Sequence, residues 1–431
     1  MKNKFLKSTL ILLIGGCITK IIGLVIKVIT TRTIGIDGVA LLALINPTYS
    51  LLLSLANFNI LVSTSKRISA KANTKKVLIN SCYIMFVLNV LLILFMFLVC
   101  RFLSVNLLKS KEAYYPLLAC TLSLPFVSLG YIVKGYFYGK QNVTPHMISN
   151  VLEQMLRLSI IAFILPYVIP YGRVVTITVL MLLNIVSESF SIIMLLLFIP
   201  KNKIFHKEDI GFDKVETKEI LAISVPSVSG RILGNIGFFF EPIILNSVLL
   251  YAGCTTQYIS IEYGVYNAYV IGTLLFPSFI IAAISNALLP EISKFYANRD
   301  MKMVRSRIRQ SILLSLGFGI VCTIAIYLSA EFLLKILYNT TAGVEYIKVL
   351  APFFILFYLE APLCSILTGI NKVKTCTIIS TTGIVLKLGV MVVLGLLGFK
   401  IYCLIIAEIV DIFYVTSLDY IALKRELKRS L

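Results

Sequence analysis

Long apolar stretches, separated by short polar segments, follow one another along the whole chain. A helix needs about 20 residues to cross a bilayer, and twelve stretches meet that length. Six lie in the first half, at residues 9–29, 39–61, 77–99, 115–138, 147–168 and 174–199. Six lie in the second half, at residues 220–250, 263–289, 311–329, 346–369, 375–397 and 401–423. The pattern predicts an all-α, polytopic transmembrane bundle of about 12 helices.

Composition agrees with a membrane-embedded chain. The 431 residues are 58% apolar and only 14% charged, whereas soluble domains are about 45–50% apolar and about 25% charged. So few charges cannot cover a surface that faces water, which argues against a soluble enzyme, a disordered scaffold or a secreted disulfide module. The net charge of +20 does not indicate a nucleic-acid binder either, because the basic residues are spread between the apolar stretches as loops would be.

The basic residues of the loops predict the orientation of the chain. With the N-terminus inside, 26 Lys and Arg residues fall on inside segments and 8 on outside segments. Because basic loops are retained in the cytoplasm, we expect a multi-pass protein of the cell membrane with both termini cytoplasmic. Lys2, Lys4 and Lys7 before an apolar run also resemble a signal peptide, and Cys17 a lipoprotein site, but the run continues to Ile29 and is expected to be the first span.

The second half of the chain repeats motifs of the first. Gly139, which begins Gly-Lys-Gln-Asn-Val-Thr, corresponds to Gly369, which begins Gly-Ile-Asn-Lys-Val-Lys. In the span that follows each motif, Arg157 corresponds to Lys387, and the offset is 230 residues in both cases. Each half begins inside with an even number of spans, so the repeat is parallel and relates the halves by a pseudo-two-fold axis along the membrane normal. Such halves are typical of transporters.

A polar segment divides the two halves. We expect an N-terminal six-helix lobe over residues 1–200, a cytoplasmic linker over 201–219 and a C-terminal six-helix lobe over 220–431. Duplication without functional content would explain the symmetry equally well.

Charged residues within the apolar stretches are the candidate functional residues. A charge at the bilayer centre costs about 2.5–3.5 kcal/mol, so such residues face a bundle interior or a wet cavity. The basic candidates for contact with a substrate in a cationic chamber are Lys20, Lys27, Arg231, Lys387 and Arg157. A net basic chamber favours an anionic substrate, because Lys and Arg bind phosphate.

Each basic candidate also has a structural interpretation. Arg157 can pair with Glu153 one helical turn away, and Lys27 can extend to the headgroups. Lys20 and Arg231 occupy matching places in the two halves and have no acid one turn away. Lys387 has Gly383 where Arg157 has Glu153, so it is expected to lack that partner and to face the chamber.

Two acidic residues are candidates for coupling to an ion or proton. Glu241 precedes Pro242 deep in the seventh apolar stretch, and proline leaves a backbone carbonyl free there. Glu360 lies within the tenth. Glu241 could instead be a structural partner of Arg231.

The segment from Lys134 to Gly139, followed by Gln141-Asn142 and by Glu153-Gln154 with Arg157, resembles the stage V sporulation protein B family of the MOP superfamily of exporters and flippases. The opening Thr19-Lys20-Ile-Ile-Gly23 fits as well. The resemblance implies a MATE-like, two-lobed bundle that works by alternating access. Its implied cargo is an undecaprenyl-pyrophosphate-linked oligosaccharide or peptidoglycan precursor, in spore cortex or cell-wall synthesis.

The leading hypothesis is therefore a flippase for a lipid-linked glycan, whose partners are its substrate and the membrane lipids, with Na⁺ or H⁺ as a coupling ion. A cation-coupled multidrug exporter on the same fold and a non-transporting scaffold are the alternatives. We expect no enzyme, no cofactor and no metal site, because neither a catalytic grouping nor ligand spacing is visible and the two histidines lie in different loops. The protein is expected to be a monomer without nucleic acid.

Overall fold

The protein, seen here as a computed structural model, is described over residues 2–70, 72–199 and 212–429. These residues form helices joined by turns and short loops, and they include no β-strand. The predicted all-α class is confirmed.

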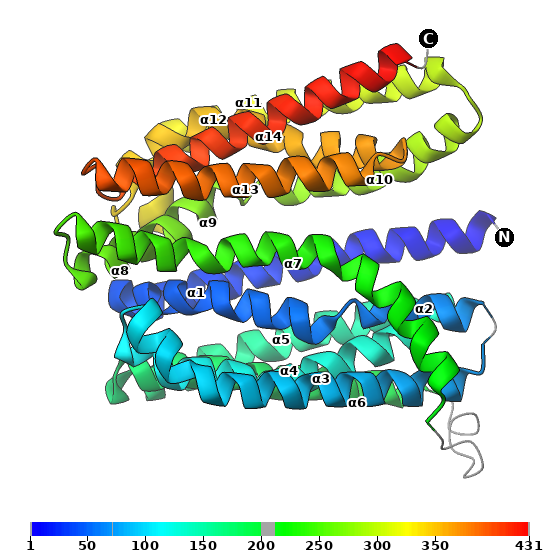
Figure 1. Cartoon of the computed structure of the whole chain (residues 1–431), viewed down its shortest axis with the longest axis horizontal. Helices are drawn as coiled ribbons and strands as arrows, with labels where there is room; N and C mark the ends of the chain where they lie inside the picture. The colour runs from blue at the N-terminus through cyan, green and yellow to red at the C-terminus, as the bar shows by residue number, and fades with distance from the viewer. Residues whose placement is uncertain (1, 71, 200–211, 430–431) are drawn as a thin grey trace. The chain divides into compact units, whose positions relative to one another are not determined.

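The first six predicted spans correspond to helices in the first half of the chain (Figure 1). The first helix reverses direction at Gly35, where the backbone turns to φ 68°, a conformation that glycine adopts without strain. The two arms on either side of Gly35 run in opposite directions (Figure 1). They therefore correspond to the first two predicted stretches. The helices are α1 (Lys2–Asn57), α2 (Ile60–Ser69), α3 (Thr74–Phe102), α4 (Tyr114–Gly139), α5 (Thr144–Val168) and α6 (Arg173–Leu197).

The remaining helices follow the other six predicted stretches. The eighth stretch is divided into several pieces by a π-helical segment, Val265–Val270, and by a turn that ends at Pro277. Proline lacks the amide proton that would continue the helix there. The helices are α7 (Lys214–Tyr251), α8 (Thr256–Gly264), α9 (Ile271–Leu274), α10 (Ser278–Ala297), α11 (Met301–Tyr338), α12 (Val344–Gly369), α13 (Val373–Leu396) and α14 (Tyr402–Arg429).

Ten helical segments of the described chain are long and apolar enough to cross a membrane. One of the ten, Ile14–Ser69, contains the reversal at Gly35, so it comprises two of the predicted stretches. Helix α14 is not among the ten, and it carries Glu408, Asp411 and Asp419 along its length. A bundle of about 12 transmembrane helices accounts for all of these segments.

The chain forms two compact units, Met1–Phe239 and Phe240–Leu431, and the boundary falls inside α7. The beginning of α7 is fixed to α2 by an ion pair of 2.7 Å between Arg67 Nη2 and Glu216 Oε2. A hydrogen bond of 2.8 Å between Ser224 and Ser63 adds to it. Helix α7 begins at Lys214, earlier than the predicted residue 220, and residues 201–211 of the predicted linker lie outside the described chain.

The sequence repeat reappears in how two helices end. A Cβ atom on Gly139, the last residue of α4, would lie 2.7 Å from Cβ of Ile68 on α2. A Cβ atom on Gly369, the last residue of α12, would lie 2.7 Å from Cγ2 of Ile292 on α10. In each unit the glycine therefore allows the end of one helix to touch its neighbour.

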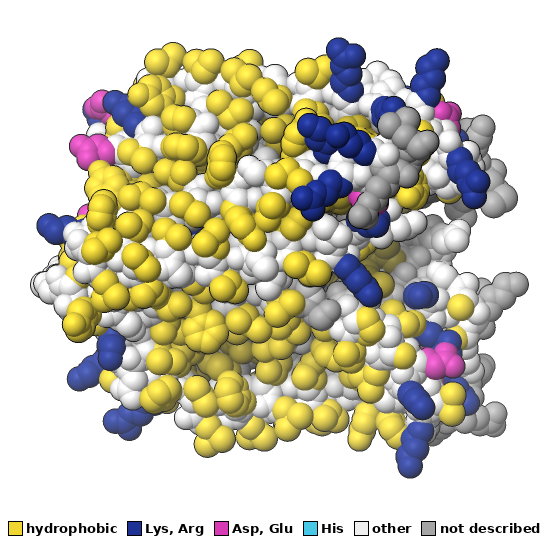
Figure 2. All heavy atoms as spheres, turned by 45° about the horizontal axis from the view of Figure 1, so that its top comes forward, with side chains coloured by type: hydrophobic (Ala, Val, Ile, Leu, Met, Phe, Trp, Pro, Cys, Tyr) yellow, Lys and Arg dark blue, Asp and Glu magenta, His cyan; other side chains and the backbone are white. Residues whose placement is uncertain are grey.

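Large apolar side chains remain exposed on the outer helices, among them Leu98 of α3 and Leu328 of α11, which are 83% and 78% exposed. In the space-filling view, hydrophobic side chains form a broad field, and many of the basic side chains gather towards one end of the view (Figure 2). Apolar area of this kind is what a lipid-facing surface requires.

Candidate binding and coupling sites

The predicted basic candidates separate into exposed and ion-paired residues. Lys20 on α1 and Arg231 on α7 are exposed, and neither forms an ion pair within the described chain. Lys27, about two turns further along α1 than Lys20, is half-buried. All three belong to the N-terminal unit.

Arg157 lies in a polar cluster between α4, α5 and α6. Its Nη2 atom is 3.3 Å from Oε1 of Glu153 and 2.8 Å from Oγ of Ser187. The pairing of Arg157 with Glu153 that was predicted from their spacing is therefore present. Lys134 of α4 lies 3.9 Å from Glu188 of α6 and completes the cluster. Two bases and two acids neutralise each other there, which limits the cost of burying them.

Lys387 lies in a second cluster, inside the C-terminal unit. Its Nζ atom is 2.6 Å from Oε2 of Glu241 on α7 and 2.6 Å from Oε2 of Glu408 on α14. Tyr263 donates a hydrogen bond of 3.1 Å to Glu241, and Tyr266 donates one of 3.0 Å to Glu408. The side chain of Lys387 is only 14% exposed, so the group is a buried, hydrogen-bonded triad of charges.

The prediction that Lys387 lacks an acidic partner is wrong. Its own helix supplies none, as Gly383 indicated, but two other helices each supply a carboxylate. Gly383 has a different role: a Cβ atom there would collide with Oδ1 of Asp411 on α14. Glu241 is correspondingly the partner of Lys387 and Tyr263 among the described contacts, rather than of Arg231.

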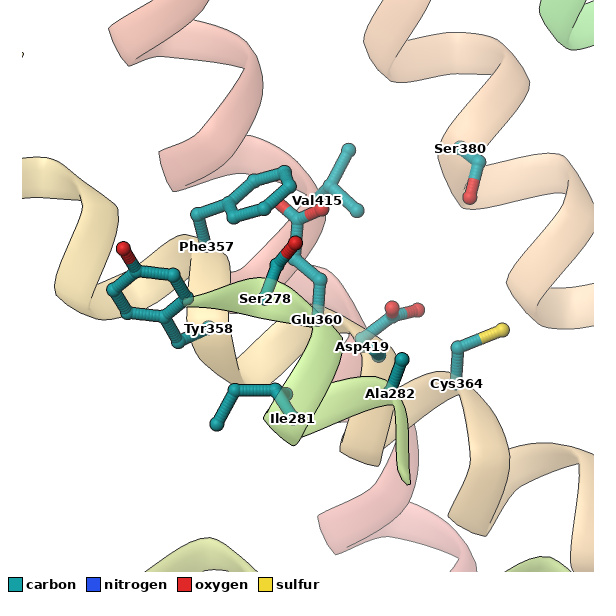
Figure 3. Close-up of a pocket in the computed structure, with 11 residues that line it drawn as sticks. Ser278, Ile281, Ala282, Phe357, Tyr358, Glu360, Cys364, Ser380, Val415 and Asp419 are labelled. Atoms are coloured by element: carbon teal, nitrogen blue, oxygen red, sulfur yellow. The ribbon is translucent and has the colours of Figure 1, made fainter. Parts of the chain in front are cut away.

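A cavity of about 350 Å³ lies in the C-terminal unit between α10, α12, α13 and α14 (Figure 3). Two carboxylates line it, Glu360 from α12 and Asp419 from α14, together with the hydroxyls of Ser278 and Ser380. Glu360 accepts a hydrogen bond of 3.4 Å from Thr416.

Asp419 was not singled out from the sequence, and it is the more buried of the two acids. Its residue is 1% exposed, and its Oδ1 atom has no hydrogen-bond partner among the described residues. A polar atom in that position is stabilised by a proton or a cation. The described chain contains no group of three or more His, Cys, Asp and Glu side chains arranged as ligands for a metal ion.

Two of the nine cysteines are joined. Cys364 of α12 and Cys376 of α13 form a disulfide whose Cα atoms lie 5.8 Å apart. The bond links two helices across the tight turn between them.

Comparison with known proteins places this arrangement in a family. The sequence model described as "Polysaccharide biosynthesis protein" matches residues 5–296, and the one described as "MatE" matches residues 267–393. The chain is 31% identical over 405 residues to stage V sporulation protein B of Bacillus subtilis (strain 168). This match covers 91% of the chain and 78% of that protein. The chain belongs to the polysaccharide biosynthesis protein family.

The chain is also similar to the lipid II flippase MurJ of Bacillus subtilis (strain 168), with 23% identity over 421 residues, a match that covers 90% of this chain and 77% of that protein. Among solved structures, an inward-facing MATE transporter of the MOP superfamily matches with a TM-score of 0.79 and 16% identity, over 96% of this chain and 95% of its own. The expected MATE-like fold and the resemblance to the stage V sporulation protein B family are confirmed.

Proposed function

We propose that this protein is a flippase that moves an undecaprenyl-pyrophosphate-linked oligosaccharide or peptidoglycan precursor across the cell membrane by alternating access. Membership of the polysaccharide biosynthesis protein family supports this function. So do the similarities to stage V sporulation protein B and to the lipid II flippase MurJ. In this proposal the protein is a monomer with both termini in the cytoplasm, and residues 1–200 and 220–431 are lobes joined by the linker 201–219.

The observation that carries the proposal is the contrast among basic residues of the membrane helices. Lys134, Arg157 and Lys387 each lie within ion-pair distance of a carboxylate. Lys20 and Arg231 are exposed and have no such partner within the described chain. An unpaired base in a membrane helix is costly unless water or an anion stabilises it. A pyrophosphate offers several charged oxygens, so it suits Lys and Arg.

This contrast assigns different roles to the five predicted bases. Lys20 and Arg231 are the headgroup contacts, with half-buried Lys27 as a further contact on the same helix as Lys20. Arg157 and Lys387 hold helices together through their carboxylates.

Reconstitution into vesicles tests the assignment. Labelled lipid II and a teichoic-type precursor would be supplied separately, and the label exposed on each face would be measured. We expect K20Q and R231Q each to lower the rate of translocation at least about tenfold, which corresponds to the loss of one charge-assisted contact of roughly 1.5–3 kcal/mol. R32Q on α1 and K218Q on α7 are matched controls, because both residues are exposed bases on the same helices. Normal translocation by both test variants would exclude this assignment.

A cation-coupled multidrug exporter is the second candidate, and the cavity with Glu360 and Asp419 favours it. Glu241 and Glu360 were the predicted coupling residues. Since Glu241 already binds Lys387, we assign coupling to Na⁺ or H⁺ to Glu360 within the cavity. In a flippase, E360Q would reduce transport of the lipid-linked substrate driven by an ion gradient. In an exporter, overexpression of the wild type would confer drug resistance and E360Q would abolish it. Neither the wild type nor E360Q would then move lipid II.

A further inference from the structure

A second cavity, of about 510 Å³, lies between the first turns of α11 and the last turns of α14. The end of α14 and the beginning of α11 are held beside each other by a hydrogen bond of 3.2 Å from Arg305 to the carbonyl of Leu427. Val304, Ile308 and Leu423 belong to one hydrophobic cluster, which fixes the two helix ends at the same level. We call this cavity the α11–α14 groove.

The α11–α14 groove combines an apolar wall with a basic rim. Its apolar residues are Ile308, Ile312 and Leu313 of α11 and Leu423 and Leu427 of α14, with Tyr420 at the deeper end. Its charged residues are Arg305, Arg309, Lys424 and Lys428, and among the described residues no acidic side chain lines it.

The four bases of the rim differ from neighbouring bases because none of them pairs with a carboxylate among the described residues. Arg307, on another side of α11, lies 3.1 Å from Glu291, and Lys372 lies 3.1 Å from Glu426. None of the four rim bases forms an ion pair in the part of the chain that the structure describes, and all four are exposed. The carboxylates near this end of the unit therefore neutralise bases outside the groove and leave its rim positive.

The rim lies where the membrane surface is expected. Helix α11 has 38 residues and is about 57 Å long at 1.5 Å per residue, which exceeds the ~30 Å hydrocarbon core. The bases of its first turns end at Arg309 and its apolar stretch begins at Ile312, while on α14 the apolar stretch ends at Leu423 and the bases begin at Lys424. Both helices thus change from apolar to basic at the same level, as a site for a headgroup above and acyl chains below requires.

We propose that the α11–α14 groove binds one anionic phospholipid of the surrounding membrane. Its phosphate lies among Arg305, Arg309, Lys424 and Lys428, and an acyl chain covers Ile312, Leu313 and Tyr420. This lipid is a bound component of the C-terminal unit and not the transported cargo, so the proposal is independent of the proposed function. Ordinary loop charge that marks the cytoplasmic side would require neither the shared groove nor the absence of carboxylates from its wall.

The full-length protein, purified in detergent and stripped of lipid, tests the proposal by native mass spectrometry with added phosphatidylglycerol or phosphatidylcholine. The test variant is R305Q/K424Q. The matched control is K302Q/R425Q, which removes one Lys and one Arg from the same two helices at exposed positions outside the groove. We expect the test variant to bind phosphatidylglycerol about ten- to thirtyfold more weakly, since each base near an anionic surface contributes roughly a factor of five. The control should bind as the wild type does.

Three outcomes would overturn the proposal. Equal losses in test and control variants would mean that general surface charge attracts the lipid. If the wild type bound phosphatidylcholine as tightly as phosphatidylglycerol, the rim would not select lipids by the net charge of the headgroup. Displacement of phosphatidylglycerol by undecaprenyl pyrophosphate at equal concentration would assign the groove to the carrier lipid. If R305Q/K424Q is poorly folded, Leu313→Gln serves instead: it changes an apolar wall residue that is 60% exposed and should weaken binding of long-chain but not of short-chain phosphatidylglycerol.

Discussion

Replacing Lys387 by methionine is the sharpest test of the buried triad. The substitution keeps the length of the side chain but removes the charge that contacts Glu241 and Glu408, each at 2.6 Å. Both carboxylates then remain buried, with exposed fractions of 5% and 15%. Each keeps one tyrosine hydroxyl, from Tyr263 or Tyr266, as a donor.

The expected loss is large because two acids are left without their shared cation. Removing one partner of a buried ion pair costs about 3–5 kcal/mol. The remaining tyrosine hydrogen bonds prevent a larger loss, since each is worth about 1.5–3 kcal/mol to a charged group. We therefore expect K387M to lower the free energy of unfolding by about 3–5 kcal/mol, which shifts the ratio of folded to unfolded protein by roughly a hundredfold to several thousandfold.

Unfolding by SDS in mixed micelles, followed by circular dichroism, would measure the change. The triple variant K387M/E241Q/E408Q should regain most of the lost stability, because it removes the uncompensated charges along with the lysine. K374M is the control, since Lys374 is an exposed base on the same helix. If K387M unfolds like the wild type, or if the triple variant is less stable than K387M, the triad does not stabilise the C-terminal unit.

Two further predictions concern helix packing and capping. In thermal unfolding, G139A and G369A should each lower the free energy of unfolding by about 1–3 kcal/mol, because the added methyl group meets Ile68 or Ile292. The control is G234A, whose added methyl group meets nothing within 4 Å and should be neutral or stabilising. Equal effects of all three substitutions would contradict the packing argument. Asp213 accepts hydrogen bonds from the amides of Val215 and Glu216 at the start of α7, and these bonds hold the pKa of its carboxyl below the usual 3.8. Its contribution to stability is therefore fully present above pH ~4 and is lost progressively as the pH falls through the lowered value. D213A should reduce the melting temperature at pH 7, and the reduction should become smaller as the pH is lowered below about 4. A reduction that stays the same size down to the acid limit of folding would show that the cap does not act through its charge.

Much of the fold could be predicted from the sequence, because membrane helices are marked by the length of their apolar stretches. All twelve stretches correspond to described helical segments, although several run into the adjoining turns. The bounds were less exact: α7 extends further towards the N-terminus than its apolar stretch does, because its first turns are polar and bind α2 through Glu216.

The ion pairs could be predicted only where they are local. Glu153 and Arg157 are one helical turn apart, so spacing alone indicated their contact. The partners of Lys387 come from α7 and α14, and their convergence depends on how three helices pack. The sequence shows both partners, Glu241 and Glu408, as acidic residues within apolar stretches, and it shows a glycine at position 383. Only the structure shows that this glycine makes room for Asp411 and that Asp419 lines a cavity.

The way α7 is shared between the two units has a consequence for dividing the chain. A cut between residues 200 and 211 would leave the whole of α7 on the C-terminal fragment, including the residues that contact Ser63 and Arg67 of the N-terminal unit. The N-terminal fragment would then expose the surface of α2 that the beginning of α7 contacts. Two such fragments expressed together should recognise each other and reassemble without a covalent connection, whereas either one alone would lack part of its packing.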